Sequence, residues 1–491
     1  MKALAQNGRR PRPRRGCQLC AQAALAVLLA GSAQAKQLAQ GPDGAWEIDL
    51  GGFYKAYGAG VLLPSGLADG TEALARTLDA ARLQLPPDLA STLPALEPIP
   101  RSAALSTNVA RVEGRILWGA RLDFNLAYQL GLALASNAAL STGTILGGSP
   151  VGSASVEPGS TSVASRRMWD LNPILASNGS YQLVQNLDRL SLKLSLVRHV
   201  DLVVGRQVLS WGTGKLWNPT DLLSPFAPTD IDKEVRKGVD AARVSFQLGA
   251  TGLLDLLWLP QPRAADNGAV MRGQFNLGGY DFSVSAAKYI SDVVFGADTS
   301  GDLGPLGVHA EAAYTLGITG WDHGPLKVQE RFLRAVAGLE WRPHEKVILL
   351  AEYYFNGFGA EGSSGYLAKL QSDRIAQGEI FGAGRHYLGI VASWLATDLV
   401  TGSLTVIGNL QDPSVQLVPM VEWSLEQNVL LRFGGFIPIG RGPDPRALQA
   451  LTVSDVVGQT QAFRDAVSTF GLRSEYGTAA GGVFVQLSAY R

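Results

Sequence analysis

The stretch that most resembles a site of chemistry is residues 203–222, VVGRQVLSWGTGKLWNPTDL, in which Gly214 and Lys215 end a glycine-rich turn. A phosphate-binding loop needs the pattern G-x-x-x-x-G-K-[ST], because its backbone N–H groups wrap the phosphates and its hydroxyl holds magnesium. Leu209 stands where the first glycine is required, and Leu216 replaces the serine or threonine. The pattern fails at two positions, so we exclude a nucleotide phosphate site at this turn.

Other residues that could do chemistry are few and scattered. Cys17 and Cys20 have the C-x-x-C spacing of a redox or metal pair, but both lie in a segment that we expect to be removed on export. No H-E-x-x-H or G-x-S-x-G pattern is present, and the five histidines lie far apart: His199, His309, His323, His344 and His386. We therefore expect no enzyme, bound metal or cofactor. Sequence alone leaves open a serine and a histidine that meet on adjacent strands.

The first 35 residues have the layout of a secretory signal peptide, with six basic residues and no acid before the apolar run AQAALAVLLA and the small residues up to Ala35. The run is shorter than the ~20 residues that a spanning helix needs, so we expect cleavage after Ala35 and not an anchor. Cleavage leaves 42 − 6 = 36 basic residues against 42 acidic ones, a formal charge of −6. This balance argues against a nucleic-acid partner. A mature chain without cysteine also suits passage through an oxidising periplasm.

The mature chain, residues 36–491, is dominated by a period of two. In RLDFNLAYQLGLAL (121–134), leucine and aromatic residues share one face, whereas Asp123, Asn125 and Gln129 share the other. Strict alternation indicates strands, and many of these reach the ~9–11 residues that cross a bilayer at a tilt. Aromatic residues gather at strand ends, where they favour the bilayer interface. We predict an all-β fold, a transmembrane antiparallel up-and-down barrel, in preference to a secreted sandwich.

Connection lengths predict about eighteen strands, with sixteen inside the error of the boundaries. The region 291–305 is the least secure, and Pro419 falls inside a proposed strand. Short periplasmic turns are expected at Arg198-His199, Ala250-Thr251, Pro343-His344, Ala396-Thr397 and Glu426. Long extracellular loops are expected on the other side, at 59–107, 137–185, 212–237, 358–383 and 439–478. Both ends of the mature chain then lie in the periplasm.

A strand end of the form R-Q-x-x-x-W-G, followed by N-P-x-D, resembles a largely uncharacterised family of porin-like outer-membrane barrels of Gram-negative bacteria. The matching residues are Arg206, Gln207, Trp211, Gly212, Asn218, Pro219 and Asp221. The resemblance covers about residues 200–245 and implies an outer-membrane barrel with a structured loop after this strand, but no substrate. The last residues, GGVFVQLSAYR, resemble the terminal strand that the barrel-assembly machinery recognises, although Arg491 follows the aromatic residue.

The loop after this strand is predicted to bend into the lumen. Gly212 and Gly214 permit a sharp inward bend, and Asn218-Pro219 fixes a turn. Trp217 and Phe226 can anchor the loop against the barrel wall, and Trp211 and Asp221 complete the motif that shapes the loop. The loop charges expected to line a constriction are Asp230, Asp232, Lys233, Glu234, Arg236 and Lys237. The strand residues expected to face the lumen are Arg189, Lys193, Arg206 and Arg243, although Arg206 shares its face with Leu202 and Val204. Alternatively, these charges only solvate the lumen and pin the loop.

Together these patterns favour a porin-like channel of the outer membrane, which lets small solutes pass passively through a lumen narrowed by loop 212–237. One alternative is a plugged conduit for a lipid-like or polysaccharide substrate, working with an envelope exporter and predicting an apolar lumen or a plug formed by loop 59–107. A second alternative is a non-conducting scaffold. The expected partners are outer-membrane lipid, the assembly machinery during biogenesis, and a small solute or lipid-like ligand, with the oligomeric state undetermined.

Overall fold

A computed structural model gives the structure of the chain over residues 36–41, 44–84, 100–136, 167–178, 180–322, 324–457, 461–462 and 473–491. The expected signal peptide, 1–35, lies outside these described residues. So do 85–99 in the first expected long loop and 137–166 in the second. The strands and the loop after the fifth strand of the barrel are all within the described part.

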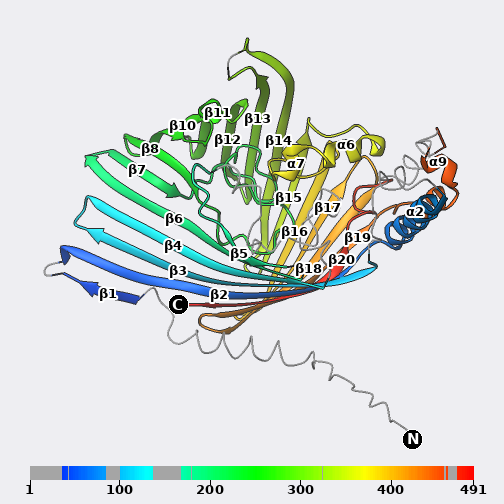
Figure 1. The fold of residues 1–491 in the computed structure, drawn as a ribbon. Helices are drawn as coiled ribbons and strands as arrows, with labels where there is room; N and C mark the ends of the chain where they lie inside the picture. Colours follow the sequence, from blue (N-terminus) through cyan, green and yellow to red (C-terminus); the bar gives the residue numbers. More distant parts are fainter. Residues whose placement is uncertain are drawn as a thin grey trace, which may run out of the picture.

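Eighteen strands pair with their neighbours in one closed antiparallel ring (Figure 1). They are β2 (Trp46–Leu62), β3 (Ser102–Trp118), β4 (Leu122–Ala135), β6 (Tyr181–Val197), β7 (Val200–Gln207), β8 (Val239–Leu248), β9 (Gly252–Leu259), β10 (Gly268–Leu277), β11 (Tyr280–Tyr289), β12 (Asp292–Leu303), β13 (Leu306–Thr319), β14 (Lys327–His344), β15 (Val347–Asn356), β16 (His386–Thr397), β17 (Val400–Asn409), β18 (Ser414–Glu426), β19 (Val429–Ile439) and β20 (Gly481–Tyr490). The barrel closes where β20 pairs with β2, from Phe53↔Tyr490 to Leu62↔Gly481. The predicted fold class and the count of eighteen are confirmed.

Two short strands add to the ring at its edges. β1 (Lys36–Gln40) pairs with the first residues of β2, below the point where β20 ends. β5 (Ile174–Ser177) pairs with β6 at Leu183, above the end of β7. Neither replaces a strand of the ring.

Some predicted boundaries shift. The strand expected to reach Trp211 ends at Gln207, because the chain leaves the wall there and residues 209 and 211 pack inside the barrel. The short turns predicted at Pro343-His344, Ala396-Thr397 and Glu426 are the last residues of their strands, and each turn comes one or two residues later. The insecure region 291–305 is a regular strand, β12.

Pro419 lies inside β18, as the alternation predicted. It faces Leu404 of β17, whereas the ladder to β19 has no pairs between Leu417↔Ile437 and Met420↔Gly434. The register is the same on both sides of this gap. The missing N–H of proline therefore interrupts the ladder to one neighbour without ending the strand.

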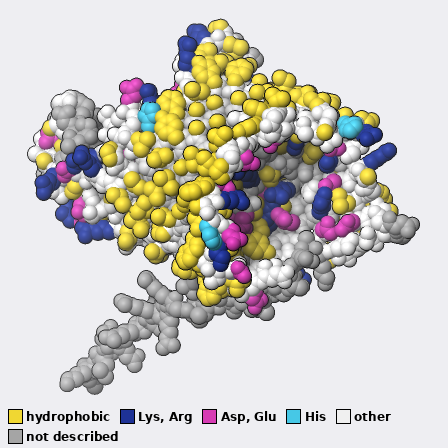
Figure 2. Space-filling view, turned by 180° about the vertical axis from the view of Figure 1, so that it is seen from behind, with side chains coloured by type: hydrophobic (Ala, Val, Ile, Leu, Met, Phe, Trp, Pro, Cys, Tyr) yellow, Lys and Arg dark blue, Asp and Glu magenta, His cyan; other side chains and the backbone are white. Residues whose placement is uncertain are grey.

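The outside of the barrel is apolar. Large hydrophobic side chains of successive strands are exposed there, such as Leu126, Val204, Phe275, Leu404 and Phe433. Figure 2 shows hydrophobic side chains spread over the outer wall. A wall that alternates apolar-out and polar-in is what a barrel presents to lipid.

Helices gather at the end of the barrel that carries the long loops (Figure 1). They are α2 (Ser65–Gln84), α6 (Tyr366–Leu370), α7 (Asp373–Ala376), α8 (Pro445–Gln449) and α9 (Val453–Val457), with short 3-10 turns η2 (Ala264–Asp266) and η3 (Ser363–Gly365). α2 buries Leu67, Ala75 and Leu78 and packs against α8 and α9. Among the described helices, none is both long and apolar enough to cross a bilayer.

Candidate channel constriction

The loop between β7 and β8, residues 208–238, folds into the barrel. Its backbone contacts side chains of β13 and β15, and its acidic side chains contact β2, β19 and β20. These strands lie around much of the ring, so the loop crosses the lumen (Figure 1). The prediction that this loop bends inward is confirmed.

Two glutamates of the wall hold the first half of the loop. Glu311 in β13 accepts hydrogen bonds from the backbone N–H groups of Thr213, Gly214 and Thr220, at 2.9, 3.1 and 2.5 Å. Glu352 in β15 accepts three more, at 2.6, 2.9 and 3.3 Å, from the backbone of residues 215–217. Nε2 of His309 lies 2.8 Å from the same Glu352 carboxylate. Hydrogen bonds to a charged acceptor are among the stronger ones, so this anchor fixes the loop backbone.

The tight turn at this anchor needs glycine. Gly212 has φ +83°, and a Cβ there would lie 1.9 Å from Oδ1 of Asn218. Nδ2 of Asn218 donates to the carbonyl of Trp211 at 2.6 Å and closes the turn. At Gly214 a Cβ would lie 1.9 Å from the carbonyl oxygen of Trp217. The turn lies at these glycines and at Asn218, the residues to which the sequence assigned the bend, and the carbonyl oxygen of Pro219 accepts a hydrogen bond from Arg334 of β14 at 3.2 Å.

Apolar side chains seal the same half of the loop against the wall. Trp211, Leu222 and Leu223 belong to one buried cluster with lumen-facing residues of β9 to β13, among them Leu257 and Tyr289. Trp217 stacks on Tyr354 of β15 at 5.3 Å between ring centroids and lies 6.0 Å from Tyr387 of β16. Trp217 therefore has the anchoring place that the sequence suggested.

Asp221 caps the turn that follows. Its carboxylate accepts from the backbone N–H of Ser224 at 3.1 Å and is paired with Arg236. Burial raises the pKa of Asp221 to about 6, although the Arg236 guanidinium acts in the opposite direction. Arg236 also lies over the ring of Phe226, 4.6 Å from its centroid.

The second half of the loop is held by ion pairs to the opposite wall. Nζ of Lys55 in β2 lies 2.5 Å from Asp232 and 2.8 Å from Glu234. Glu234 also pairs with Arg432 of β19 at 2.6 Å and accepts from the hydroxyl of Tyr490 in β20. Burial alone raises the pKa of Glu234, but its bonds to Lys55, Tyr490 and Arg432 outweigh this and lower it to about 2.

The loop charges thus do not form a simple ring around a pore. Asp232 is buried, and Asp230 turns back to accept from the backbone N–H of Ala227 at 2.8 Å. Nζ of Lys233 reaches the carbonyl of Pro228 at 3.5 Å, and burial lowers its pKa. Of the six predicted loop charges, Glu234 is the most exposed, and Asp230, Lys233, Arg236 and Lys237 are half-buried. The contribution of Lys237 to a constriction stays a prediction.

Three of the four predicted wall residues present charge to the lumen, each beside a carboxylate. The exposed fractions of the Arg189, Lys193 and Arg243 side chains are 33%, 42% and 27%. Lys193 lies 2.9 Å from Asp201, and Arg243 makes two 2.9 Å contacts with Asp255. Arg189 lies 3.9 Å from Asp188.

Arg206 is the exception and corrects the prediction. Its side chain is 2% exposed, pairs with Asp240 at 2.7 Å and donates to the carbonyls of Leu187 and Trp169. The segment at Trp169 packs over the end of β7 here and takes up the guanidinium. Arg206 therefore ties the end of the second long loop to the wall and does not line the channel.

The residues that fix the loop were not predicted from the sequence; they are Lys55, His309, Glu311, Glu352 and Arg432. Each lies on the polar face of a correctly predicted strand, as do Arg111 and Arg115. Alternation assigned their strands, but no local pattern shows which polar side chains a distant loop will contact. A survey of every ionisable residue on the polar faces would have included them.

The loop divides the inner wall into a covered and an open part. Arg272, Glu311, Arg334 and Glu352, on β10 to β15, are buried beneath it or beside its neighbours. Several charged residues of β3 to β8 stay partly exposed, namely Glu113, Arg115, Arg189, Lys193, Asp201 and Arg243. Others on the same strands are buried in ion pairs, namely Arg111, Asp188, Arg206 and Asp240. Figure 2 shows the opening of the barrel as a hollow containing basic and acidic side chains.

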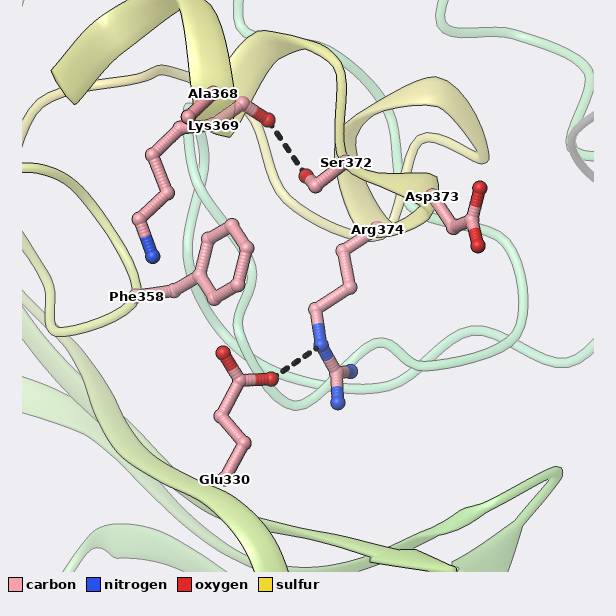
Figure 3. A pocket seen from close by; sticks show the side chains of 7 residues that line it. All are labelled: Glu330, Phe358, Ala368, Lys369, Ser372, Asp373 and Arg374. Carbon is pink, nitrogen blue, oxygen red and sulfur yellow. Dashed lines mark hydrogen bonds and ion pairs between the residues drawn. The ribbon is translucent and has the colours of Figure 1, made fainter.

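A separate shallow pocket of about 410 Å³ lies at the loop end, between β14 and the helices α6 and α7 (Figure 3). Nζ of Lys369 lies over the ring of Phe358, 3.9 Å from its centroid. Arg374 is held there by Glu330, Glu379 and Asp292 at 2.6–3.0 Å. These contacts pin loop 357–385 onto the rim. In the part of the chain that the structure covers, no three or more His, Cys, Asp or Glu side chains are grouped to hold a metal.

Comparison with known proteins gives structural likeness only. No known family matches the sequence, and no curated protein matches it. The fold is similar to that of OccAB1 of Acinetobacter baumannii, with a TM-score of 0.48 and 10% identity over 94% of this chain and 99% of that one. OccD3 (OpdP) of Pseudomonas aeruginosa gives 0.44 and 7%, over 94% of each chain. A triple mutant of the Rhodopseudomonas blastica porin gives 0.40 and 10%, over 90% and 100%.

Proposed function

We propose that the protein is an outer-membrane channel through which small polar solutes diffuse passively, along the part of the lumen between loop 208–238 and strands β3 to β8. The observation that carries this proposal is the division of the inner wall. The loop covers the apolar surface of β8 to β13, whereas several charged side chains on β3 to β8, such as Arg115 and Lys193, stay partly exposed. A charged, water-exposed wall favours hydrated solutes over lipid-like ones.

The plugged-conduit alternative has less support. It predicted an apolar lumen, but the apolar surface of β9 to β13 is buried under the loop. It also predicted a plug from loop 59–107, whose described helix, α2, packs against α8 and α9 at the rim. Outer-membrane lipid and the barrel-assembly machinery belong to the proposal as partners. Catalysis and a cofactor are not part of it.

Single-channel recording in a planar bilayer tests the proposal. The open wall pairs its charges, as in Lys193 with Asp201 and Arg243 with Asp255, so we expect steady conductance with weak ion selectivity. Lys193→Gln with Arg243→Gln leaves two carboxylates without their partners and should shift the reversal potential in a salt gradient towards cations. Arg342→Gln is a matched control, because Arg342 is exposed and pairs with Glu340 elsewhere on the barrel. A silent wild-type protein would contradict the proposal.

A further inference from the structure

The seam at which the barrel closes lies under the tip of the lumen loop. β2 and β20 are the first and last strands of the ring, and they pair only over Phe53–Leu62 and Gly481–Tyr490. In this pairing Lys55 lies opposite Ser488, and Tyr57 lies opposite Gln486. Lys55 and Gln486 bond to loop residues, and Tyr57 belongs to the cluster against which Ile231 of the loop packs.

Asp232 bonds to both sides of the seam. Its Oδ2 lies 2.5 Å from Nζ of Lys55 in β2, and the same oxygen accepts from Nε2 of Gln486 in β20 at 3.3 Å. Lys55 is 1% exposed, and the Asp232 side chain is similarly buried. Separation of β2 from β20 would therefore break both bonds of one buried carboxylate.

Glu234 also bonds to both strands of the seam. It binds Lys55 of β2 at 2.8 Å, the hydroxyl of Tyr490 in β20 at 2.5 Å, and Nη2 of Arg432 in β19 at 2.6 Å. Lys55 also lies 4.7 Å from the ring centroid of Phe53 and 5.6 Å from that of Tyr490. One loop carboxylate thus joins three consecutive strands of the ring.

An apolar contact accompanies these bonds. Ile231 packs against a buried cluster that combines Tyr57 of β2, Phe436 of β19 and Phe484 of β20. Phe484 stacks with Tyr57 across the seam, at 6.1 Å between centroids. The loop tip therefore presents both charge and apolar surface to the place where the ring closes.

We propose that residues 231–234 act as an internal staple of the barrel, so that seating of the lumen loop and pairing of β2 with β20 form one cooperative unit. Elsewhere in the ring, neighbouring strands follow one another along the chain and are joined by one turn or one loop. All the other strands of the ring lie between β2 and β20 in the chain, so no direct connection helps to keep these two in register. Bonds from the loop supply a cross-link that such a seam otherwise lacks.

Hydrogen exchange in the refolded, full-length mature protein tests this. The triple variant Lys55→Met, Asp232→Asn, Glu234→Gln removes the staple without leaving an unpaired charge in this cluster, since Arg432 keeps Glu422 at 2.7 Å. We expect the amides of 53–62 and 481–490 to exchange about tenfold faster or more, because charge-assisted bonds no longer oppose local opening. The amides of β13 and β14 should exchange as in the wild type.

A matched control removes a pair away from the seam. Lys193→Met with Asp201→Asn breaks a 2.9 Å pair between β6 and β7, two strands joined by a short turn. This variant should leave the exchange of β2 and β20 unchanged. The single variant Lys55→Met leaves two acids facing each other and should refold less well than the triple variant.

If the seam amides of the triple variant exchange at the wild-type rate, the proposed staple is wrong. An increase spread equally over all strands would also contradict it, because it would mean a general loss of stability. Failure of the triple variant to close, with the control closing normally, would support it. The conductance of the wild-type protein is independent of these results, so the staple and the channel can fail separately.

Discussion

Asp221 is the loop carboxylate that we expect to be protonated first as the pH falls. Its pKa is raised to about 6 by burial, whereas Glu234 has a pKa of about 2 and keeps its charge. Protonation of Asp221 leaves the positive charge of Arg236 without its partner, and Arg236 is partly exposed. The two halves of the loop therefore respond differently to pH.

We expect the reversal potential of the wild-type channel to shift towards anions as the pH falls through about 6. The Asp221→Asn channel should show this anion preference at every pH, so its reversal potential should no longer change as the pH falls through about 6. The sign for stability follows from linkage. A carboxyl whose pKa is raised by folding stabilises the fold fully only below its unfolded value of ~4, and this contribution is lost as the pH rises to about 6. A wild-type shift that persists in Asp221→Asn would exclude this residue.

Glu352 is the residue on which the first anchor depends most. Glu352→Gln removes the charge and places an amide N–H₂ among three backbone donors, so it should lower the free energy of unfolding by about 1–3 kcal/mol. We also expect noisier single-channel currents. Glu340→Gln is the control, because Glu340 bonds only to the exposed Arg342 two residues away. Equal urea midpoints for the two variants would contradict the anchor.

Sequence alone could predict some of these residues but not others. Trp217, Asn218 and the glycines are recognisable because turn chemistry and a buried aromatic ring are local properties. Glu311 and Glu352 look like any polar residue on the inner face of a strand, and their role depends on loop residues that lie 98 and 136 positions away in the chain. Arg206 was expected to face the lumen. Nothing near it in the sequence indicates that residues 167–171 pack over it.

At the scale of elements, alternation was enough to place every strand of the ring, since each strand must turn one face to lipid and the other to water. It could not place the end of β7. The residues after Gln207 continue the alternation, but they turn inward because the wall offers apolar partners such as Leu257 and Val270. The path of a loop inside a barrel is decided by tertiary packing.

Gly212 lets this element bend, and Gly249 offers a matched comparison. Both have positive φ, +83° and +70°, but a Cβ at Gly249 meets nothing within 4 Å. Gly249→Ala should lower the free energy of unfolding by about 1–2 kcal/mol, because of its backbone conformation alone. Gly212→Ala adds a clash with Asn218 and should destabilise the loop further, measured as urea unfolding and as faster exchange of 209–224. Equal costs at the two positions would show that the contact with Asn218 is unimportant.

At the scale of the whole molecule, β1 and the end of β20 make different contributions to closure. β1 pairs only with residues 47–50 of β2, below the seam, and Leu38 is exposed. Removal of residues 36–40 should leave the conductance and the urea midpoint near those of the wild type. Removal of 486–491 deletes two staple partners and half of the seam, so it should prevent closure, seen as loss of the heat-modifiable band. Loss of that band on removal of 36–40 would mean that β1 takes part in closure.

The contacts at the seam also set the speed at which the chain can fold. Lys55 and Asp232 are 177 residues apart, and Asp232 and Gln486 are 254 apart. Contacts of such long sequence separation are slow to form, because the entropy of closing the intervening loop is lost before any contact is gained. Along the chain Lys55 comes before Asp232, and Gln486 comes after both. The native barrel therefore cannot close until β20 has arrived, and until then the earlier strands depend on whatever protects them in the periplasm.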